Sequence, residues 1–77
     1  MAIVIHRRLD LQGLPCPGPV RAVNDALAQM ASGELVEVLA TDPCAVREFA
    51  VWARSTGNDL LESSQFGNVF RFVVRKL

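Results

Sequence analysis

The sequence has no net charge and no long apolar run. Eight Lys and Arg residues balance eight Asp and Glu residues, so the formal net charge at pH 7 is zero. Nucleic-acid binding needs a surplus of basic side chains that neutralise phosphates, so no direct nucleic-acid partner is expected. No apolar segment approaches the roughly 20 residues that a membrane-spanning helix needs, so the chain is not expected to be embedded in a membrane.

Cysteine and histidine are scarce. Two cysteines, Cys16 and Cys44, are too few for the disulfide framework of a small secreted protein. The apolar start at residues 2–5 is too short for a signal peptide and precedes its basic residues instead of following them. We therefore expect a cytoplasmic protein whose surroundings keep both thiols reduced. His6 is the only histidine and has no cluster of companion ligands, so no metal site is expected.

The length of 77 residues predicts one domain that spans residues 1–77. A domain of this size buries only about 60% of its unfolded surface, which leaves little material for a deep pocket. An exposed reactive group or a flat docking face is therefore the expected kind of site.

Hydrophobic spacing predicts six elements in the order strand, helix, strand, helix, strand, strand. Apolar residues alternate over residues 3–11, where Arg7 interrupts the apolar side, and the nearly continuous apolar run at 35–41 indicates a strand inside a sheet. Helical spacing marks 17–31 and a second helix that Gly57 closes; further strands are expected at 59–64 and 69–75. The buried stripes of the helices are expected at Val20, Val23, Leu27 and Met30, and at Val46, Phe49, Ala50 and Ala53. The order predicts an α+β fold, a two-layer βαβαββ sandwich in which a mixed four-stranded sheet carries both helices on one face.

Cys16 lies between the first strand and the first helix, in the run Leu14-Pro15-Cys16-Pro17-Gly18-Pro19. Proline suits the first helical position but not a helix interior, which predicts that Pro17 begins the helix and that Cys16 is its N-cap. The partial positive charge at a helix N-terminus favours the thiolate, the form that attacks sulfur and can carry it as a persulfide. Because cysteine is a poor cap, helix stability alone does not explain it.

An inert Cys16 is the alternative, since free cysteines often serve as small buried apolar residues. The two flanking prolines favour the reactive interpretation, because they stiffen the residue that would need a fixed presentation. Pro19 removes another amide from the first turn, so Gly18 and Val20 supply the nearby N–H groups that could face the sulfur or an attached anion.

Cys44 has a similar setting, because Asp42 and Pro43 are expected as the N-cap and first residue of the second helix. If the first two strands are parallel and joined by a right-handed crossover, both helices begin at one edge of the sheet. Neighbouring helices pack about 8–10 Å apart, whereas a disulfide needs Cα atoms within about 7 Å, so direct bridging is expected to need movement. Cys44 is either a functional thiol, which resolves a bond at Cys16 or holds the sulfur as a second carrier, or a small residue that is tolerated at a helix start.

Two further sets of residues are candidates for partner contacts. Arg21, Arg47 and Arg54 could steer anionic donors or help a partner dock, although exposed arginines are also typical of a solvated helix face. The uncovered face of the sheet could recruit a partner as a non-catalytic binding or regulatory module, with Arg71, Val73 and Arg75 supplying part of that face. A Cys16/Cys44 redox pair is a third alternative, which the spacing of the helices disfavours.

Several motifs occur in a characteristic order: Leu9-Asp10, Gly13-Leu14, Cys16-Pro17-Gly18-Pro19 and Asp42-Pro43. With them the chain resembles, over nearly its whole length, the TusA/SirA/YeeD family of small sulfur-carrier proteins, which are sulfurtransferases. The hallmark of that family is Cys-Pro-x-Pro preceded by Leu-Asp-x-x-Gly-Leu. The resemblance implies a two-layer βαβαββ fold and a persulfide carried on Cys16.

The resemblance also implies partners. Cys16 would accept sulfane sulfur from a rhodanese or a cysteine desulfurase and pass it to the cysteine of an acceptor such as a DsrE-like protein. Family destinations include tRNA thiolation, sulfur oxidation and thiosulfate handling beside a membrane transporter, and no cofactor is implied. The family does not imply an obligatory thiol at Cys44, so no role is transferred to that residue.

Overall fold

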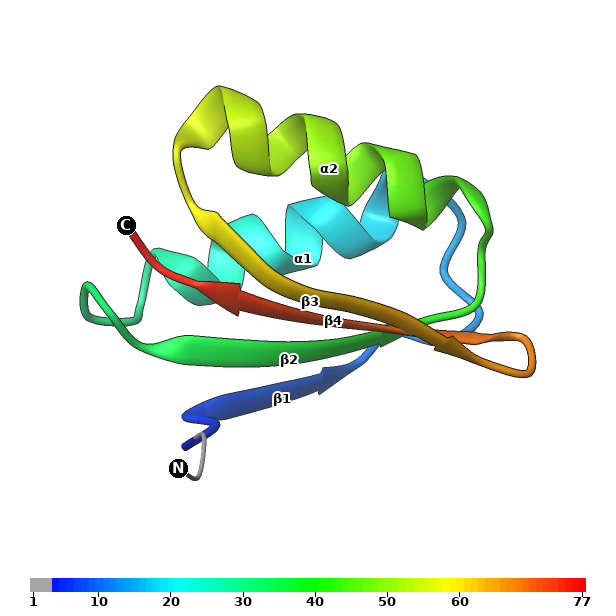
Figure 1. The fold of residues 1–77 in the computed structure, drawn as a ribbon, viewed down its shortest axis with the longest axis horizontal. Helices are drawn as coiled ribbons and strands as arrows, with labels where there is room; N and C mark the ends of the chain where they lie inside the picture. Colours follow the sequence, from blue (N-terminus) through cyan, green and yellow to red (C-terminus); the bar gives the residue numbers. More distant parts are fainter. Residues whose placement is uncertain (1–3) are drawn as a thin grey trace.

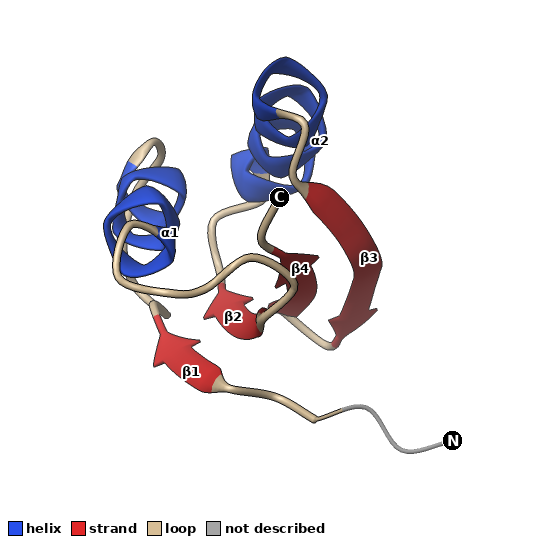
Figure 2. Ribbon diagram, turned by 90° about the vertical axis from the view of Figure 1, so that its left-hand side faces the viewer, coloured by secondary structure: helices blue, strands red, loops and turns tan. Residues whose placement is uncertain are grey.

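The computed structural model describes residues 4–77 and shows two layers, a four-stranded sheet and two helices that cover one of its faces (Figures 1 and 2). The elements are, in order, β1 (Arg7–Asp10), α1 (Gly18–Leu27), β2 (Leu35–Ala40), α2 (Cys44–Thr56), β3 (Asp59–Phe66) and β4 (Val69–Arg75). The predicted α+β fold with βαβαββ order is confirmed.

The sheet is mixed and has the strand order β1-β2-β4-β3. Strand β1 pairs parallel to β2, and β4 runs antiparallel to both β2 and β3. The apolar run of β2 thus lies inside the sheet, as its composition predicts. Because β1 and β2 are parallel, α1 and α2 both begin at the same end of the sheet, which is also the end of the β3–β4 turn (Figure 1).

The core fills the space between the sheet and the helices. Phe49 is fully buried at its centre, with its ring 4.4 Å from that of Phe72 and 5.9 Å from that of Trp52. Trp52 Nε1 donates a hydrogen bond of 2.8 Å to Asn24 Oδ1, which joins α2 to α1 and satisfies the indole N–H. The predicted stripe of α1 is confirmed, since Val23, Leu27 and Met30 are buried and Val20 packs against them.

The predicted stripe of α2 is wrong at Val46. Its side chain is 41% exposed, whereas Ala45, Phe49 and Trp52 are buried. These three residues follow the i, i+4, i+7 spacing of one helix face, and that face is turned by one residue from the expected one. The bulk of Trp52 fits this face, because its ring packs edge-on against Phe49.

Three elements differ from the predicted bounds by two residues or more. The first strand is shorter than 3–11, because β1 lies at the edge of the sheet and pairs only with β2; Ile3 lies outside the described residues. Helix α1 ends at Leu27, after which the Gln29 and Met30 amides bond three residues back in tight turns. Strand β3 extends to Phe66, because it pairs with β4 as far as the turn and absorbs a bulge between Leu60 and Glu62.

A row of ion pairs crosses the uncovered face of the sheet. Arg8 lies 3.4 Å from Glu37, and Arg71 bonds Glu37 at 2.8 Å and also contacts Glu62, so the row joins β1, β2, β4 and β3. Hydrogen bonds from Arg71 and then Ser64 lower the pKa of Glu62, while bonds to Glu37 and Glu62 raise the pKa of Arg71.

These pairs change the expected partner face. Arg71 is held between Glu37 and Glu62, Arg75 pairs with Asp59, and Val73 is only 2% exposed. Contacts within the chain therefore already occupy all three residues that the sequence suggested for partner binding. No helix among residues 4–77 has the length and apolar character needed to cross a membrane.

Replacing Phe49 with alanine should lower the free energy of unfolding by about 3 to 5 kcal/mol, because the change leaves a cavity between Trp52 and Phe72. Denaturant unfolding measures the loss. The matched control is Val51→Ala on the exposed side of the same helix, which should change stability by no more than about 0.5 kcal/mol. Equal losses in the two variants would contradict the central position of Phe49.

Candidate functional site

Cys16 and Cys44 meet at the end of the sheet where both helices begin. Their sulfur atoms form a disulfide, and their Cα atoms are 6.4 Å apart. Cys16 is half-buried and packs against the core, whereas Cys44 is exposed in the first turn of α2. The predicted meeting of the two residues at one edge is confirmed.

The expectation that bridging would need movement is wrong. Axis spacings of about 8–10 Å describe helices packed along their lengths. Cys16 instead lies in the turn before α1, and Cys44 is the first residue of α2. At these positions the chain follows the connecting loops, which approach each other more closely than the helix axes do. Among residues 4–77 no cysteine is a free thiol in this state.

The predicted N-caps are each displaced by one residue. Pro17, and not Cys16, is the N-cap of α1, and Pro43, and not Asp42, is the N-cap of α2. Pro19 lies within the first turn of α1 and is buried. The Gly18 amide donates to the Pro15 carbonyl at 2.8 Å, so it is not available to the sulfur as the sequence suggested.

Asp42 ties the two cysteine segments together. Its Oδ2 accepts a hydrogen bond of 3.2 Å from the Cys16 amide, and its Oδ1 accepts one of 3.0 Å from the Cys44 amide. A third bond runs from the Gly13 amide to Thr41 Oγ1 at 2.9 Å. The carboxylate therefore positions the backbone of both cysteines, a role that capping rules alone did not reveal. The signal available in the sequence was that Asp42 follows a strand parallel to the one that precedes Cys16.

The site is shallow and open. A depression of about 340 Å³ borders it and is lined by Gly13, Leu14, Pro15, Thr41, Asp42 and Pro43. Such a surface gives a small molecule little enclosure, but it admits a protein side chain to the neighbouring sulfurs. The expectation of an exposed site on a small domain agrees with this shape.

Cys16, Asp42 and Cys44 are residue types that commonly bind metal ions, but the two cysteines are not in the form that binds them. Cys16, Asp42 and Cys44 each offer one ligand atom, and these atoms lie within 4.8 Å of one another. Zinc binds cysteine as the thiolate. The two sulfurs are bonded to each other here, so the pair supplies no thiolate in this state.

The arginines divide between the two ends of the molecule. Arg21 and Arg47 are exposed, and each is the fourth residue of its helix, so both belong to the end that carries the cysteines. Arg54 is in the last turn of α2, at the opposite end. His6 precedes β1, where its Nδ1 accepts a hydrogen bond of 3.1 Å from the Leu35 amide, so it belongs to the structure of the sheet.

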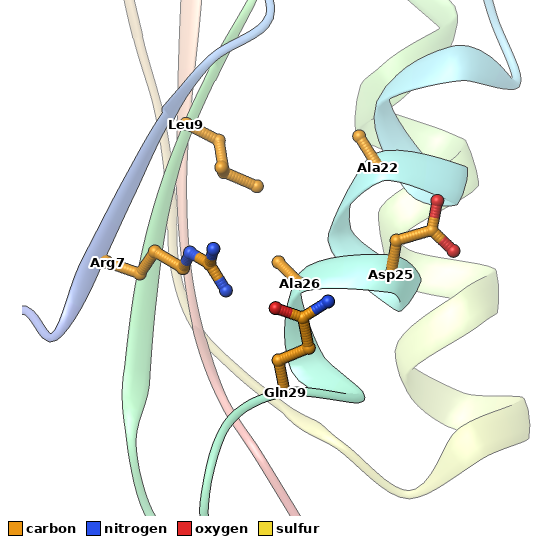
Figure 3. A pocket seen from close by; sticks show the side chains of 6 residues that line it. All are labelled: Arg7, Leu9, Ala22, Asp25, Ala26 and Gln29. Carbon is orange, nitrogen blue, oxygen red and sulfur yellow. The ribbon is translucent and has the colours of Figure 1, made fainter.

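A second depression, of about 220 Å³, lies between the edge strand β1 and α1. Figure 3 shows Arg7 and Leu9 pointing from β1 toward Ala26 and Gln29. Arg7 does interrupt the apolar side of this strand, as the sequence predicts. Neither cysteine lines this depression.

The comparisons with known proteins agree with the motif around Cys16. The family Sulfurtransferase TusA matches residues 7–76, nearly the whole chain. This chain belongs to the TusA family. Sulfur carrier protein TusA of Allochromatium vinosum is 41% identical over 70 residues, which cover 91% of this chain and 92% of that protein. A putative sulfur carrier protein of Neisseria meningitidis is 45% identical over 67 residues, which cover 87% and 90%.

The TusA family match extends to other named relatives and to the fold. The putative sulfur carrier protein YedF of Escherichia coli is 35% identical over 74 residues, covering 96% of both chains. A crystal structure of a SirA-like protein from Desulfitobacterium hafniense superposes with a TM-score of 0.79 over 90% of this chain and 95% of that one. Its sequence identity is 24%, so this likeness concerns the fold.

Reducing the disulfide should lower the free energy of unfolding by about 3 to 4 kcal/mol, because the bond closes a loop between residues 28 positions apart. Unfolding in denaturant with and without reductant measures the difference. Cys44→Ser is the control and should unfold identically in both conditions. Equal stability of oxidised and reduced wild type would contradict the bond.

Replacing Asp42 with alanine should cost about 2 kcal/mol of stability, because two amides lose a charged, half-exposed acceptor. Asp42→Asn retains one acceptor oxygen and should lose about half as much. Both variants are compared with wild type in the reduced state, so that the disulfide does not contribute. An Asp42→Ala protein as stable as wild type would rule out the positioning role.

Proposed function

We propose that this chain is a sulfur carrier in which Cys16 takes a sulfane sulfur as a persulfide and delivers it to a partner thiol. The observation that carries the proposal is the position of Cys16 in the Cys-Pro-Gly-Pro run, at an open end of the molecule beside a shallow depression. Relatives that bear the name sulfur carrier protein support the same role.

The transfer begins from the reduced protein. The Cys16 thiolate attacks the outer sulfur of a donor persulfide, a new S–S bond forms, and the donor leaves as its thiolate. An acceptor thiolate then attacks the outer sulfur on Cys16, and Cys16 leaves as the thiolate with which it began. Neither step has a net redox change, and neither requires a cofactor. The chain thus acts as a sulfurtransferase that holds its cargo between two proteins.

The surroundings of Cys16 support this chemistry. Pro17 and Pro19 stiffen the chain on the helix side of the thiol, and the start of α1 provides a partial positive charge. Arg21 and Arg47 are exposed on the first turns of the helices, where their charges can steer a sulfur-loaded partner or an anion such as thiosulfate.

The partners follow from the two half-reactions. The donor is a protein that forms a persulfide, of the rhodanese or cysteine desulfurase class. The acceptor is a protein with an accessible thiol, of the DsrE-like class, and a thiosulfate transporter is an alternative neighbour. A reducing compartment such as the cytoplasm supplies the thiol form of Cys16.

A matched pair of single-thiol variants tests the proposal. Reduced Cys44→Ser, treated with a low-molecular-weight persulfide, should gain the mass of one sulfur atom, located on Cys16 by peptide mapping. Reduced Cys16→Ser keeps the more exposed cysteine and should remain unloaded. Intact-mass spectrometry after alkylation reads both results. Equal loading of the two variants would defeat the assignment of the carrier role to Cys16.

A dithiol redox protein is the second candidate, and the Cys16–Cys44 disulfide favours it. Such a protein would reduce a partner disulfide and would not gain sulfur mass at any stage. The loading of Cys44→Ser therefore separates the two candidates.

A further inference from the structure

Cys44 is the reactive group that the carrier cycle does not use. The cycle needs one thiol, yet the structure places a second sulfur in bonding contact with the first. Cys44 is exposed, begins α2, and has its amide held by the same carboxylate that holds the Cys16 amide. A second thiol fixed at this distance has direct access to whatever Cys16 carries.

We propose that Cys44 discharges a sulfur-loaded Cys16 by displacing hydrosulfide, so that the chain releases sulfide in addition to carrying sulfane sulfur. The inference rests on the proposed function, because it begins from the Cys16 persulfide. The disulfide in the structure is the product state of this reaction.

The reaction balances without a further reactant. The Cys44 thiolate attacks Sγ of the protonated Cys16 persulfide, and a bond forms between the two cysteine sulfurs. The bond from Cys16 Sγ to the outer sulfur breaks, and the outer sulfur leaves with the electron pair and its proton as hydrosulfide. The outer sulfur is reduced, and the two cysteines are together oxidised by two electrons to the disulfide. A new round requires an external dithiol of the thioredoxin class, which reopens the disulfide by exchange.

The structure places Cys44 Sγ within bonding reach of the inner sulfur of the proposed persulfide. The observed disulfide joins Cys44 Sγ to Cys16 Sγ, which is the bond that the discharge forms. Attack on the outer sulfur would instead move the cargo to Cys44 and would leave no disulfide. Hydrosulfide is also a good leaving group, and the open depression beside the cysteines lets it reach solvent.

Proximity, and not charge, favours the reaction. The sulfur atoms of Cys16 and Cys44 and a carboxylate oxygen of Asp42 lie within 4.8 Å of one another. Because Asp42 holds both backbones, the attacking thiol has an effective concentration far above that of a thiol in solution.

The test follows sulfide and protein mass in the same sample. Reduced, desalted wild type, Cys44→Ser and Cys16→Ser each receive one equivalent of glutathione persulfide, and aliquots are quenched over time with monobromobimane. Wild type should release one equivalent of sulfide and end as the Cys16–Cys44 disulfide. Cys44→Ser should keep its sulfur and release sulfide at least about tenfold more slowly, since only thiols in solution can discharge it. Cys16→Ser reports the decay of the donor together with its direct reaction with Cys44, and Cys44→Ala repeats the measurement with a second side chain at the exposed position.

Three other results would overturn the inference, each in a recognisable way. Equal retention of sulfur by wild type and Cys44→Ser would remove the discharge and leave the carrier function standing. Sulfur found on Cys44 in wild type would show that Cys44 accepts the sulfur from Cys16 and that hydrosulfide is not released. If neither wild type nor Cys44→Ser gains sulfur at early times, the carrier function itself fails, and the discharge fails with it.

Discussion

The parallel pairing of β1 with β2 is the constraint on which the site depends. In this register Arg7 lies opposite Val36 and Asp10 opposite Leu39, so both strands leave the sheet at one edge and in one direction. The backbone bond from the Leu11 amide to the Leu39 carbonyl, at 2.8 Å, continues the pairing beyond the strands. Because the two loops then run side by side, residues far apart in the sequence come into hydrogen-bonding contact through Thr41 and Asp42. An antiparallel pair would send the two loops to opposite ends of the sheet and would separate the cysteines.

The two faces of the sheet serve different purposes. One face is covered by the helices and holds the aromatic core around Phe49. The other is uncovered by helices, but a row of alternating charges from Arg8 to Glu62 lies across it, and Val73 on this face is only 2% exposed. An uncovered sheet face is a common location for a binding surface, yet here its charged groups are paired within the chain. The proposed site lies instead at the end of the molecule where both helices begin and the two cysteines meet.

Much of the fold could be predicted from the sequence, because its signals are local. The apolar run of β2, the stripe of α1 and Gly57, which closes α2 with a φ of 80°, each follow from the chemistry of a few neighbouring residues. The predictions were wrong where tertiary contacts determine which helix face is buried or how far a strand extends. The face of α2 turned by one residue to bury Trp52 against Phe49 and Asn24, and β3 lengthened because β4 offered a partner as far as the turn.

The candidate site was predictable in its residues and less so in its distances. The positions of the prolines and the expected parallel crossover predicted that Cys16 and Cys44 lie at one edge of the sheet. The distance between them could not be predicted, because the usual spacing of helix axes does not apply to residues at the helix starts. The two hydrogen bonds that Asp42 accepts from the Cys16 and Cys44 amides could not be predicted either, because a capping rule considers one helix at a time.

The hydrogen bonds of Asp42 run to backbone amides and not to sulfur. They do not involve the sulfur atoms, so opening the disulfide, or loading Cys16 as proposed, breaks neither bond. On the proposed function, a partner that docks at this end would meet loops of the same backbone shape in each state. It would then distinguish an empty carrier from a full or an oxidised one by the reaction at the sulfur, and not by the conformation of the loops.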